Sequence, residues 1–152
     1  MHKLIRRTLP VLVAVVGAAS HAQAPSPMPS LDDAPLIVQV KDAKWTPSTV
    51  TGVAPGIMKW YVAGDPKTGP AVNYSKFPAG YVFPMHWHSY AESTVVISGE
   101  VHYVIDGKSY DLAPGSYVVF PAKLRHELTC SKSGPCIVLI RRAGPLDYNF
   151  EK

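Results

Sequence analysis

The sequence predicts an all-β fold in which short antiparallel strands of one domain close into a barrel or jelly roll. The 152 residues can bury one hydrophobic core but are too few for two ordinary domains. The 15 prolines and 11 glycines favour many turns and few long helices. Evenly spaced short strands normally close on themselves or pack as two sheets, because this removes exposed strand edges.

Seven turn signals divide the folded part of the chain into eight or more strands. Typical signals are Gly64-Asp65-Pro66 and Asp106-Gly107. The runs between the turns are rich in Val, Ile, Tyr and Phe, have strand length, and show no sustained helical period. The predicted strands cover residues 57–63, 71–77, 81–88, 94–97, 101–105, 116–120, 126–130 and 137–141.

Residues 1–22 have the features of a secretory signal peptide. Lys3, Arg6 and Arg7 precede an apolar run over residues 9–19, and Ser20-His21-Ala22 offers small residues for cleavage after position 22. The alternative is a membrane anchor, but the run has about half of the roughly 20 residues needed to span a bilayer. We therefore expect a mature chain that is periplasmic or secreted.

Two details of export stay open. Cleavage after Ala24 would leave Pro25 next to the cut, where a peptidase reads it poorly, so a mature chain starting at Gln23 is preferred. Arg6-Arg7 weakly resembles a twin-arginine export signal, although Ile5 stands where that signal usually has Ser or Thr. The general secretory route and the twin-arginine route therefore both remain.

Residues 23–35 are expected to form a flexible leader, and residues 36–150 the folded domain. The leader is rich in Pro, Ser, Ala and Asp and cannot bury enough apolar surface to offset the cost of ordering. Three of the 15 Lys and Arg residues lie in the signal peptide, so 12 remain against 11 acidic residues. Without a clustered basic face or a second long apolar stretch, we expect no nucleic-acid partner and no membrane span.

Three residues of metal-ligand type lie within seven positions. His86 and His88 are two apart, so in a strand both imidazoles point to one face and Trp87 points to the other. Glu92 keeps the same even spacing, or is brought near if the chain bends at Ser89-Tyr90. Each residue alone could belong to the surface of an edge strand, but together they predict a metal site.

This segment resembles the first motif of the cupin superfamily. Gly80, five residues, His86-x-His88, three residues, Glu92, six residues and Gly99 reproduce that motif without a gap. The resemblance covers roughly residues 36–150 and implies a single cupin barrel, also called a double-stranded β-helix or jelly roll. The chain looks like small secreted cupins related to the metal-binding domain of ChrR-type anti-sigma factors.

The second cupin motif follows as Gly115, five residues, Pro121 and then His126, which the resemblance implies as the fourth metal ligand. The chain departs from this motif at two positions, since Lys123 stands where glycine is usual and Cys130 where asparagine is frequent. If the turn needs a left-handed residue, Lys123 costs about 1 kcal/mol relative to glycine.

The implied ligand set suits one divalent transition metal. Three neutral imidazoles and a carboxylate can hold Fe, Mn, Ni, Co or Zn, and an octahedral ion would keep two open positions for water, dioxygen or a chelating substrate. Family analogy also implies a homodimer. Pocket shape decides the metal, the substrate and the reaction, so the sequence names none of them.

Other polar residues have weaker claims, and no catalytic residue is assigned. A phenol near the metal could act as acid or base, although tyrosines on barrel strands more often pack; the candidates are Tyr81, Tyr90, Tyr103 and Tyr117. Lys123 and Arg125 could meet an anionic substrate, but a solvated loop is the simpler interpretation. His102 has no partner at ligand spacing and is left out of the site.

Cys130 and Cys136 flank a Ser-Lys-Ser-Gly-Pro turn, and we expect a disulfide between them. Closing a loop of about seven residues contributes roughly 2.4 kcal/mol on the chain-entropy estimate, and export supplies the oxidising conditions. The alternative is two free thiols on diverging strands.

Two classes of function compete. The preferred hypothesis is an exported metalloenzyme acting on a small molecule as an oxygenase, decarboxylase, isomerase or lyase. The alternative is a non-catalytic cupin that binds a sugar, a small acid or a metal as a sensor or receptor module. A purely structural barrel would require the four ligands to be dispensable.

Overall fold

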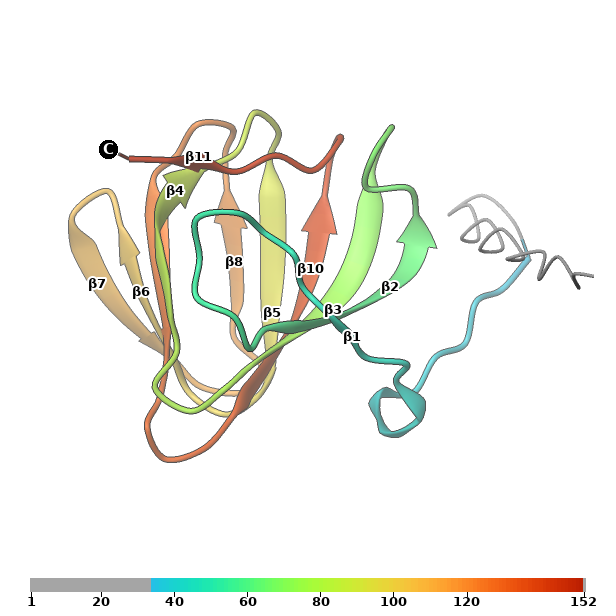
Figure 1. Cartoon of the computed structure of the whole chain (residues 1–152), viewed down its shortest axis with the longest axis horizontal. Coiled ribbons are helices and arrows are strands. Elements are labelled where there is room, and N and C mark those ends of the chain that lie inside the picture. The colour runs from blue at the N-terminus through green and yellow to red at the C-terminus, as the bar shows by residue number, and fades with distance from the viewer. Residues whose placement is uncertain (1–33, 152) are drawn as a thin grey trace, which may run out of the picture.

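Two antiparallel β-sheets face each other in the computed structural model, which describes residues 34–151 (Figure 1). The six-stranded sheet has the order β1-β2-β3-β10-β5-β8, and the five-stranded sheet has the order β11-β4-β9-β6-β7. The predicted signal peptide and all but the last two residues of the predicted leader lie outside the described residues. Within residues 34–151, no helix is long and apolar enough to cross a membrane.

The predicted all-β class is confirmed, and each of the eight predicted strands is present with its ends shifted by two residues or fewer. Besides one 3-10 turn at Val40–Asp42, the elements are β1 Thr46–Pro47, β2 Met58–Gly64, β3 Ala71–Phe77, β4 Val82–Trp87, β5 Glu92–Ser98, β6 Val101–Ile105, β7 Lys108–Leu112, β8 Tyr117–Phe120, β9 His126–Cys130, β10 Cys136–Arg142 and β11 Asn149–Phe150.

β7 was not predicted from the sequence, because it lies at the surface. Four of its five residues are exposed, so the strand lacks the alternation of apolar and polar side chains that reveals a half-buried strand. β7 pairs with β6 through the two-residue turn Asp106-Gly107. Both turn residues have positive φ, 46° and 80°, as a tight hairpin requires.

Alternating side chains of the strands fill the space between the two sheets. On β10, Val138 and Ile140 point inward and are buried, while Leu139 between them and Arg141 after them face outward. The apolar core comprises Ile57, Phe77, Tyr81, Phe83, Val96, Val101, Tyr103, Phe120, Leu128, Cys130, Cys136, Val138 and Ile140. The inward positions near one end of the barrel are polar instead, and they form the site described below.

A register shift in β4 turns a histidine into the barrel. β4 pairs with β9 at Phe83↔Leu128 and next at His86↔His126, so three steps on one strand match two on the other. Residues three apart on a regular strand point to opposite faces, but the extra residue brings Phe83 and His86 to the same side. Both are buried, and their ring centroids lie 4.7 Å apart.

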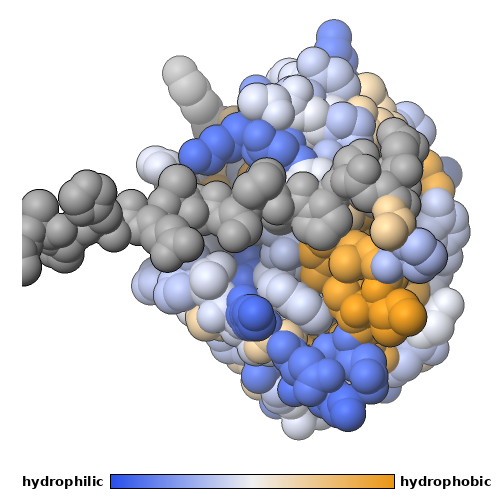
Figure 2. Space-filling view, turned by 90° about the vertical axis from the view of Figure 1, so that its right-hand side faces the viewer, coloured by the Kyte–Doolittle hydropathy of each residue, from blue (hydrophilic) through white to orange (hydrophobic). Residues whose placement is uncertain are grey.

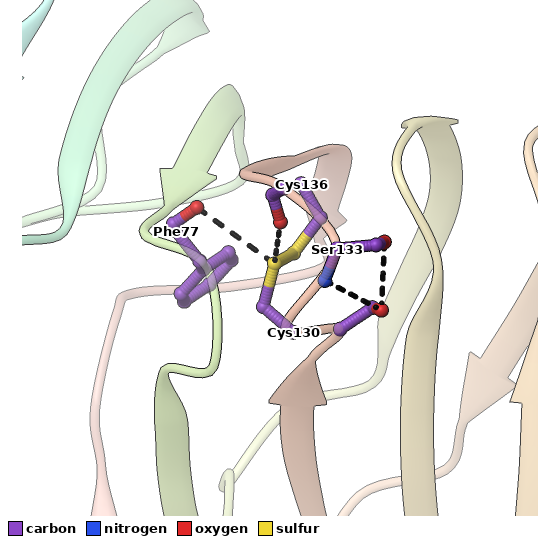
Figure 3. The surroundings of a disulfide bond; sticks show 6 residues. Phe77, Cys130, Ser133 and Cys136 are labelled. Atoms are coloured by element: carbon purple, nitrogen blue, oxygen red, sulfur yellow. Dashed lines mark hydrogen bonds between the residues drawn. A yellow bond between two sulfur atoms is a disulfide. The ribbon is translucent and has the colours of Figure 1, made fainter.

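The predicted disulfide between Cys130 and Cys136 is confirmed (Figure 3). The two Cα atoms are 5.9 Å apart, and both cysteines are fully buried beside Phe77. Cys130 ends β9 of one sheet and Cys136 begins β10 of the other, so the strands are not ladder partners as in a simple hairpin. The disulfide therefore ties the two sheets together.

Candidate metal centre

Separate elements bring the four predicted ligands together. His86 lies on β4, His126 starts β9, His88 follows the end of β4, and Glu92 opens β5 in the opposite sheet. All four side chains are buried. The even spacing of Glu92 is therefore not what positions it, because the chain leaves β4 and bends at Ser89-Tyr90 before β5 begins.

The three imidazoles form a compact cluster. One ring nitrogen from each of His86, His88 and His126 lies within 4.8 Å of the others. The ring centroids of His86 and His126, which are register partners, are 4.3 Å apart. Glu92 stands at the edge of this cluster, with its Oε2 atom 3.3 Å from Nε2 of His88.

Backbone carbonyls fix the tautomer of each imidazole. A carbonyl oxygen only accepts, so the ring nitrogen facing it carries the proton and donates. The three contacts are His86 Nδ1 to Pro84 O at 2.8 Å, His88 Nδ1 to Asp147 O at 2.5 Å and His126 Nδ1 to Leu124 O at 3.0 Å. Every Nε2 atom therefore keeps a free lone pair, and this arrangement is typical of metal-binding histidines.

Two buried acceptors face each other without a donor between them. Nε2 of His88 has no hydrogen-bond partner among residues 34–151, and Oε2 of Glu92, 3.3 Å away, forms an ion pair with Nη2 of Arg142 at 2.7 Å but no well-aligned hydrogen bond. Burying an unpaired acceptor costs about 1–3 kcal/mol, and two facing acceptors also repel. A cation would satisfy both, so these side chains fit a divalent metal.

Arg142 is the residue of this site that the sequence analysis missed. Its Nη2 atom lies 2.7 Å from Oε2 of Glu92, and both side chains are buried. It pairs with Glu92 in register between β10 and β5 and takes an inward position after Val138 and Ile140. A signal was present in the sequence, since an arginine at inward parity in a buried strand needs a partner.

The site favours the protonation states that bind metal. Burial lowers the pKa of His86 to about 3 and lowers the pKa values of His88 and His126, so all three imidazoles are neutral near pH 7. Burial, the largest effect, would raise the pKa of Glu92, but the nearby Arg142 guanidinium and the three imidazoles together outweigh it and lower the pKa, so the carboxylate stays ionised. Neutral imidazoles and a carboxylate are the forms that coordinate cations.

A small cavity of about 30 Å³ lies inside the barrel beside the cluster. His86, Glu92, His126 and Arg142 contribute to its wall; other residues lining it include Lys59, Phe83, Tyr103, Leu128 and Tyr148. Its volume suits a water-sized molecule and not an organic substrate. Lys59 and Tyr148 were not predicted from the sequence as part of this wall.

Among the four candidate tyrosines, Tyr103 is the one that lines this cavity. It is buried, and burial raises its pKa. Tyr81 packs in the core, where its hydroxyl donates to the carbonyl of Ala54. Tyr90 and Tyr117 are exposed. Tyr103 is therefore the tyrosine of this set that faces the cluster.

The basic residues before His126 lie on the surface. Lys123 is exposed, and Arg125 pairs with Asp106 and Glu151 at 3.6 Å and 2.8 Å. These contacts favour the solvated-loop interpretation over a role at the site. His102, excluded from the ligand set, is partly exposed and lies 2.6 Å from the carboxylate of Asp111.

Lys123 has the left-handed backbone conformation that glycine usually adopts at this position of the second motif. Its φ angle is 67°. Its backbone N–H donates to the carbonyl of His88 at 2.8 Å, so the turn before His126 is tied to the segment that carries His88. The strained residue therefore lies in the turn whose hydrogen bond connects the second motif to the first.

Comparison with known proteins agrees with this geometry. Residues 73–140 match the family model described as the cupin domain. This is a cupin fold. The matched range contains His86, His88, Glu92 and His126. No curated protein matches the sequence.

Solved structures share the cupin barrel at low sequence identity. A cupin 2 conserved barrel domain protein from Rhodopseudomonas palustris is 14% identical, with a TM-score of 0.62 over 73% of this chain and 79% of that one. The polyketide cyclase RemF from Streptomyces resistomycificus is 15% identical, with a TM-score of 0.62 over 76% and 84%. A structure described as the DMSP lyases RdDddP and RnDddQII is 20% identical, with a TM-score of 0.56 over 63% and 53%. These likenesses establish the fold alone.

Proposed function

We propose that this chain is an exported cupin that holds one divalent transition metal on His86, His88, Glu92 and His126 and acts on a small molecule. The observation that carries the proposal is the set of three buried Nε2 lone pairs, of which that of His88 has no hydrogen-bond partner and lies 3.3 Å from the carboxylate of Glu92. The donor set suits Fe, Mn, Ni, Co or Zn.

The side chains around the cluster have separate tasks. A bound ion would supply Lewis acidity and open coordination positions. The carbonyls of Pro84, Leu124 and Asp147 hold the rings, and Arg142 helps to keep Glu92 ionised. Aromatic rings around the cluster limit access of water, with the centroid of Phe120 4.1 Å from that of His126.

The preferred activity is a metalloenzyme of the oxygenase, decarboxylase, isomerase or lyase type. Structural neighbours described as a cyclase and as lyases support it, since they are enzymes on the same fold. The alternative is a non-catalytic module that binds a sugar, a small acid or a metal. One observation favours its metal-binding form: the inner cavity of about 30 Å³ is too small for an organic molecule.

Metal analysis of protein purified from its native compartment tests the proposal. We expect close to one transition-metal ion per chain, followed by turnover in a screen of oxygen uptake and substrate depletion. Metal without turnover would favour the sensor alternative. Failure to take up any of the five metals after anaerobic loading would exclude a metal centre.

Export to the periplasm or the medium is part of this proposal. The buried disulfide supports it, because disulfides persist in oxidising compartments. Mass spectrometry of the exported protein should find a chain that begins at Gln23, and an intact Met1 would contradict it. The narrower relation to the metal-binding domain of ChrR-type anti-sigma factors remains a proposal from motif spacing.

We also propose that the chain forms a homodimer. Apolar side chains point outward from the six-stranded sheet, among them Ile97 on β5 and the exposed Tyr117 and Val119 on β8. One side of the molecule carries an apolar patch with hydrophilic residues below it (Figure 2). Light scattering of the purified protein should give twice the mass of the mature chain, and Val119→Lys should shift it toward a monomer.

A further inference from the structure

The barrel interior holds one more cation than its carboxylates balance. Among the described residues, the buried charged side chains are Lys59, Arg142 and Glu92. Arg142 pairs with Glu92, but no carboxylate of residues 34–151 lies within 4.0 Å of the Lys59 ammonium. A divalent metal on the histidines would increase this excess. Buried charges are normally paired, so the missing counterion needs an explanation.

Two phenols surround the Lys59 ammonium. Its Nζ atom donates to the hydroxyl of Tyr148 at 2.7 Å and lies 5.1 Å from the centre of that ring. Tyr61 is the other phenol, and its interaction with Lys59 offsets only part of the free-energy cost of burying the ammonium. Burial lowers the pKa of Lys59 to about 8, so the side chain is still mostly protonated at neutral pH.

Lys59 and Tyr148 separate two cavities. They line the small inner cavity beside the histidines, and they also line an outer pocket of about 450 Å³. That volume falls within the usual range of about 300–1,000 Å³ for small-molecule sites. The rest of the outer wall comes from residues 46–51, with Tyr61, Leu146, Asp147 and Phe150.

The wall of the outer pocket suits an anion at its inner end. Its hydroxyl groups come from threonines, a serine and the two tyrosines, and its apolar part includes Val50, Leu146 and Phe150. Asp147 is the one carboxylate among the described lining residues. Its oxygens already accept from the Ser89 N–H at 3.1 Å and from Asn149 Nδ2 at 3.0 Å. The Lys59 ammonium, in contrast, has no carboxylate partner among residues 34–151.

We propose that the outer pocket binds a small organic carboxylate, with the carboxylate on Lys59 and on the hydroxyls of Tyr61 and Tyr148. The anion supplies the missing counterion, and the apolar wall covers the organic part. The position beside the inner cavity makes this carboxylate the substrate or sensed ligand of the metal centre, a link that rests on the proposed function. Anion binding itself does not depend on that link.

Isothermal titration calorimetry with benzoate and malonate tests the proposal, and the neutral benzamide and malonamide are matched probes of the same shape. We expect wild-type protein, with and without zinc, to bind at least one of the two anions and to bind its amide at least about tenfold more weakly. Lys59→Met should weaken anion binding by about tenfold or more, whereas Lys108→Met, at an exposed position of β7, should leave it unchanged.

A second variant addresses the case in which Lys59→Met fails to fold. Thr49→Trp changes an exposed residue of the pocket wall and should fill the pocket, with the same loss of anion affinity. Two results would overturn the proposal. One is that wild-type protein binds neither benzoate nor malonate at about 10 mM, and the other is that wild type and the folded pocket variants bind the anion with equal affinity.

Zinc content, measured on the same samples, separates this inference from the proposed function. Full zinc occupancy together with anion affinity that is unchanged in Lys59→Met would contradict the carboxylate pocket but leave the proposed metal centre standing. Anion binding that depends on Lys59 in a protein that takes up no metal would support the pocket and defeat the metal centre.

Discussion

Glu92 and Arg142 stand opposite each other on β5 and β10, and Nη2 of the arginine lies 2.7 Å from Oε2 of the carboxylate. The pair is buried beside three imidazoles. The guanidinium helps to keep the carboxylate ionised, and the oxygen it contacts is also the one that lies 3.3 Å from Nε2 of His88. Glu92 therefore has two candidate cations, one fixed in the chain and one supplied by the medium.

Replacing Arg142 with methionine should destabilise the metal-free protein. The change leaves Glu92 as an unpaired buried charge, which typically costs about 3–5 kcal/mol. Urea denaturation should show this loss, and it should be smaller in the metal-loaded protein because the metal then serves as the partner. The double variant Glu92→Gln with Arg142→Met should lose less than Arg142→Met alone. A single variant as stable as wild type would show that the pair contributes nothing.

Local patterns predicted the strands, but not which inward residues meet. The alternation on β3, β9 and β10 is visible in the sequence, and so is the parity of His86 and His88. Sheet order and register are non-local, so the contact between Glu92 and Arg142 could not be read from spacing. The position of Lys59 beside Tyr148 depends on chain segments 89 residues apart.

Acid should destabilise the metal-free protein. The pKa of His86 is held at about 3 by burial, and the pKa values of His88 and His126 are also lowered. In the unfolded chain these imidazoles titrate near about 6.5. Between these values the unfolded chain binds protons that the folded protein does not, so the unfolding free energy falls as the pH falls from about 6.5 toward 3.

Urea denaturation across this pH range measures the effect. Each differentially bound proton contributes a slope of about 1.4 kcal/mol per pH unit. His86→Gln removes one titrating group and should make the slope shallower. Stability that stays constant between about pH 6.5 and 4 would show that the imidazoles are not held neutral by the fold.

Replacing Lys123 with glycine should stabilise the protein by about 1 kcal/mol. The residue has a φ angle of 67°, which costs about that amount for any side chain other than glycine. Lys123→Ala is the matched control, because alanine loses the same side chain but keeps the strain. Thermal denaturation should show a gain for glycine and little change for alanine. Equal effects would place the cause in the lysine side chain.

Removal of the disulfide should lower stability without removing the metal. The double change of Cys130 and Cys136 to alanine should cost at least about 2.4 kcal/mol from the lost chain constraint. Cys130 lies at the opposite end of β9 from His126, and Cys136 at the opposite end of β10 from Arg142. Metal content should therefore stay near that of wild type, and a parallel loss of metal would show that the two ends of the barrel are coupled.

The four proposed ligands should behave as one mononuclear site. Replacing His86, His88 or His126 with alanine removes one Nε2 lone pair and should eliminate most of the bound metal, measured by elemental analysis after loading and dialysis. Glu92→Gln should weaken binding less, because an amide oxygen still coordinates but carries no charge.

His102 supplies the control for this series. It is partly exposed and lies 2.6 Å from Asp111, away from the cluster, so His102→Ala should keep about the wild-type metal content. His126 is the decisive position, because it joins the site from the second motif and pairs in register with His86. Full metal occupancy in His126→Ala would mean that the second motif does not supply a ligand. The proposed site would then need a different fourth member beside His86, His88 and Glu92.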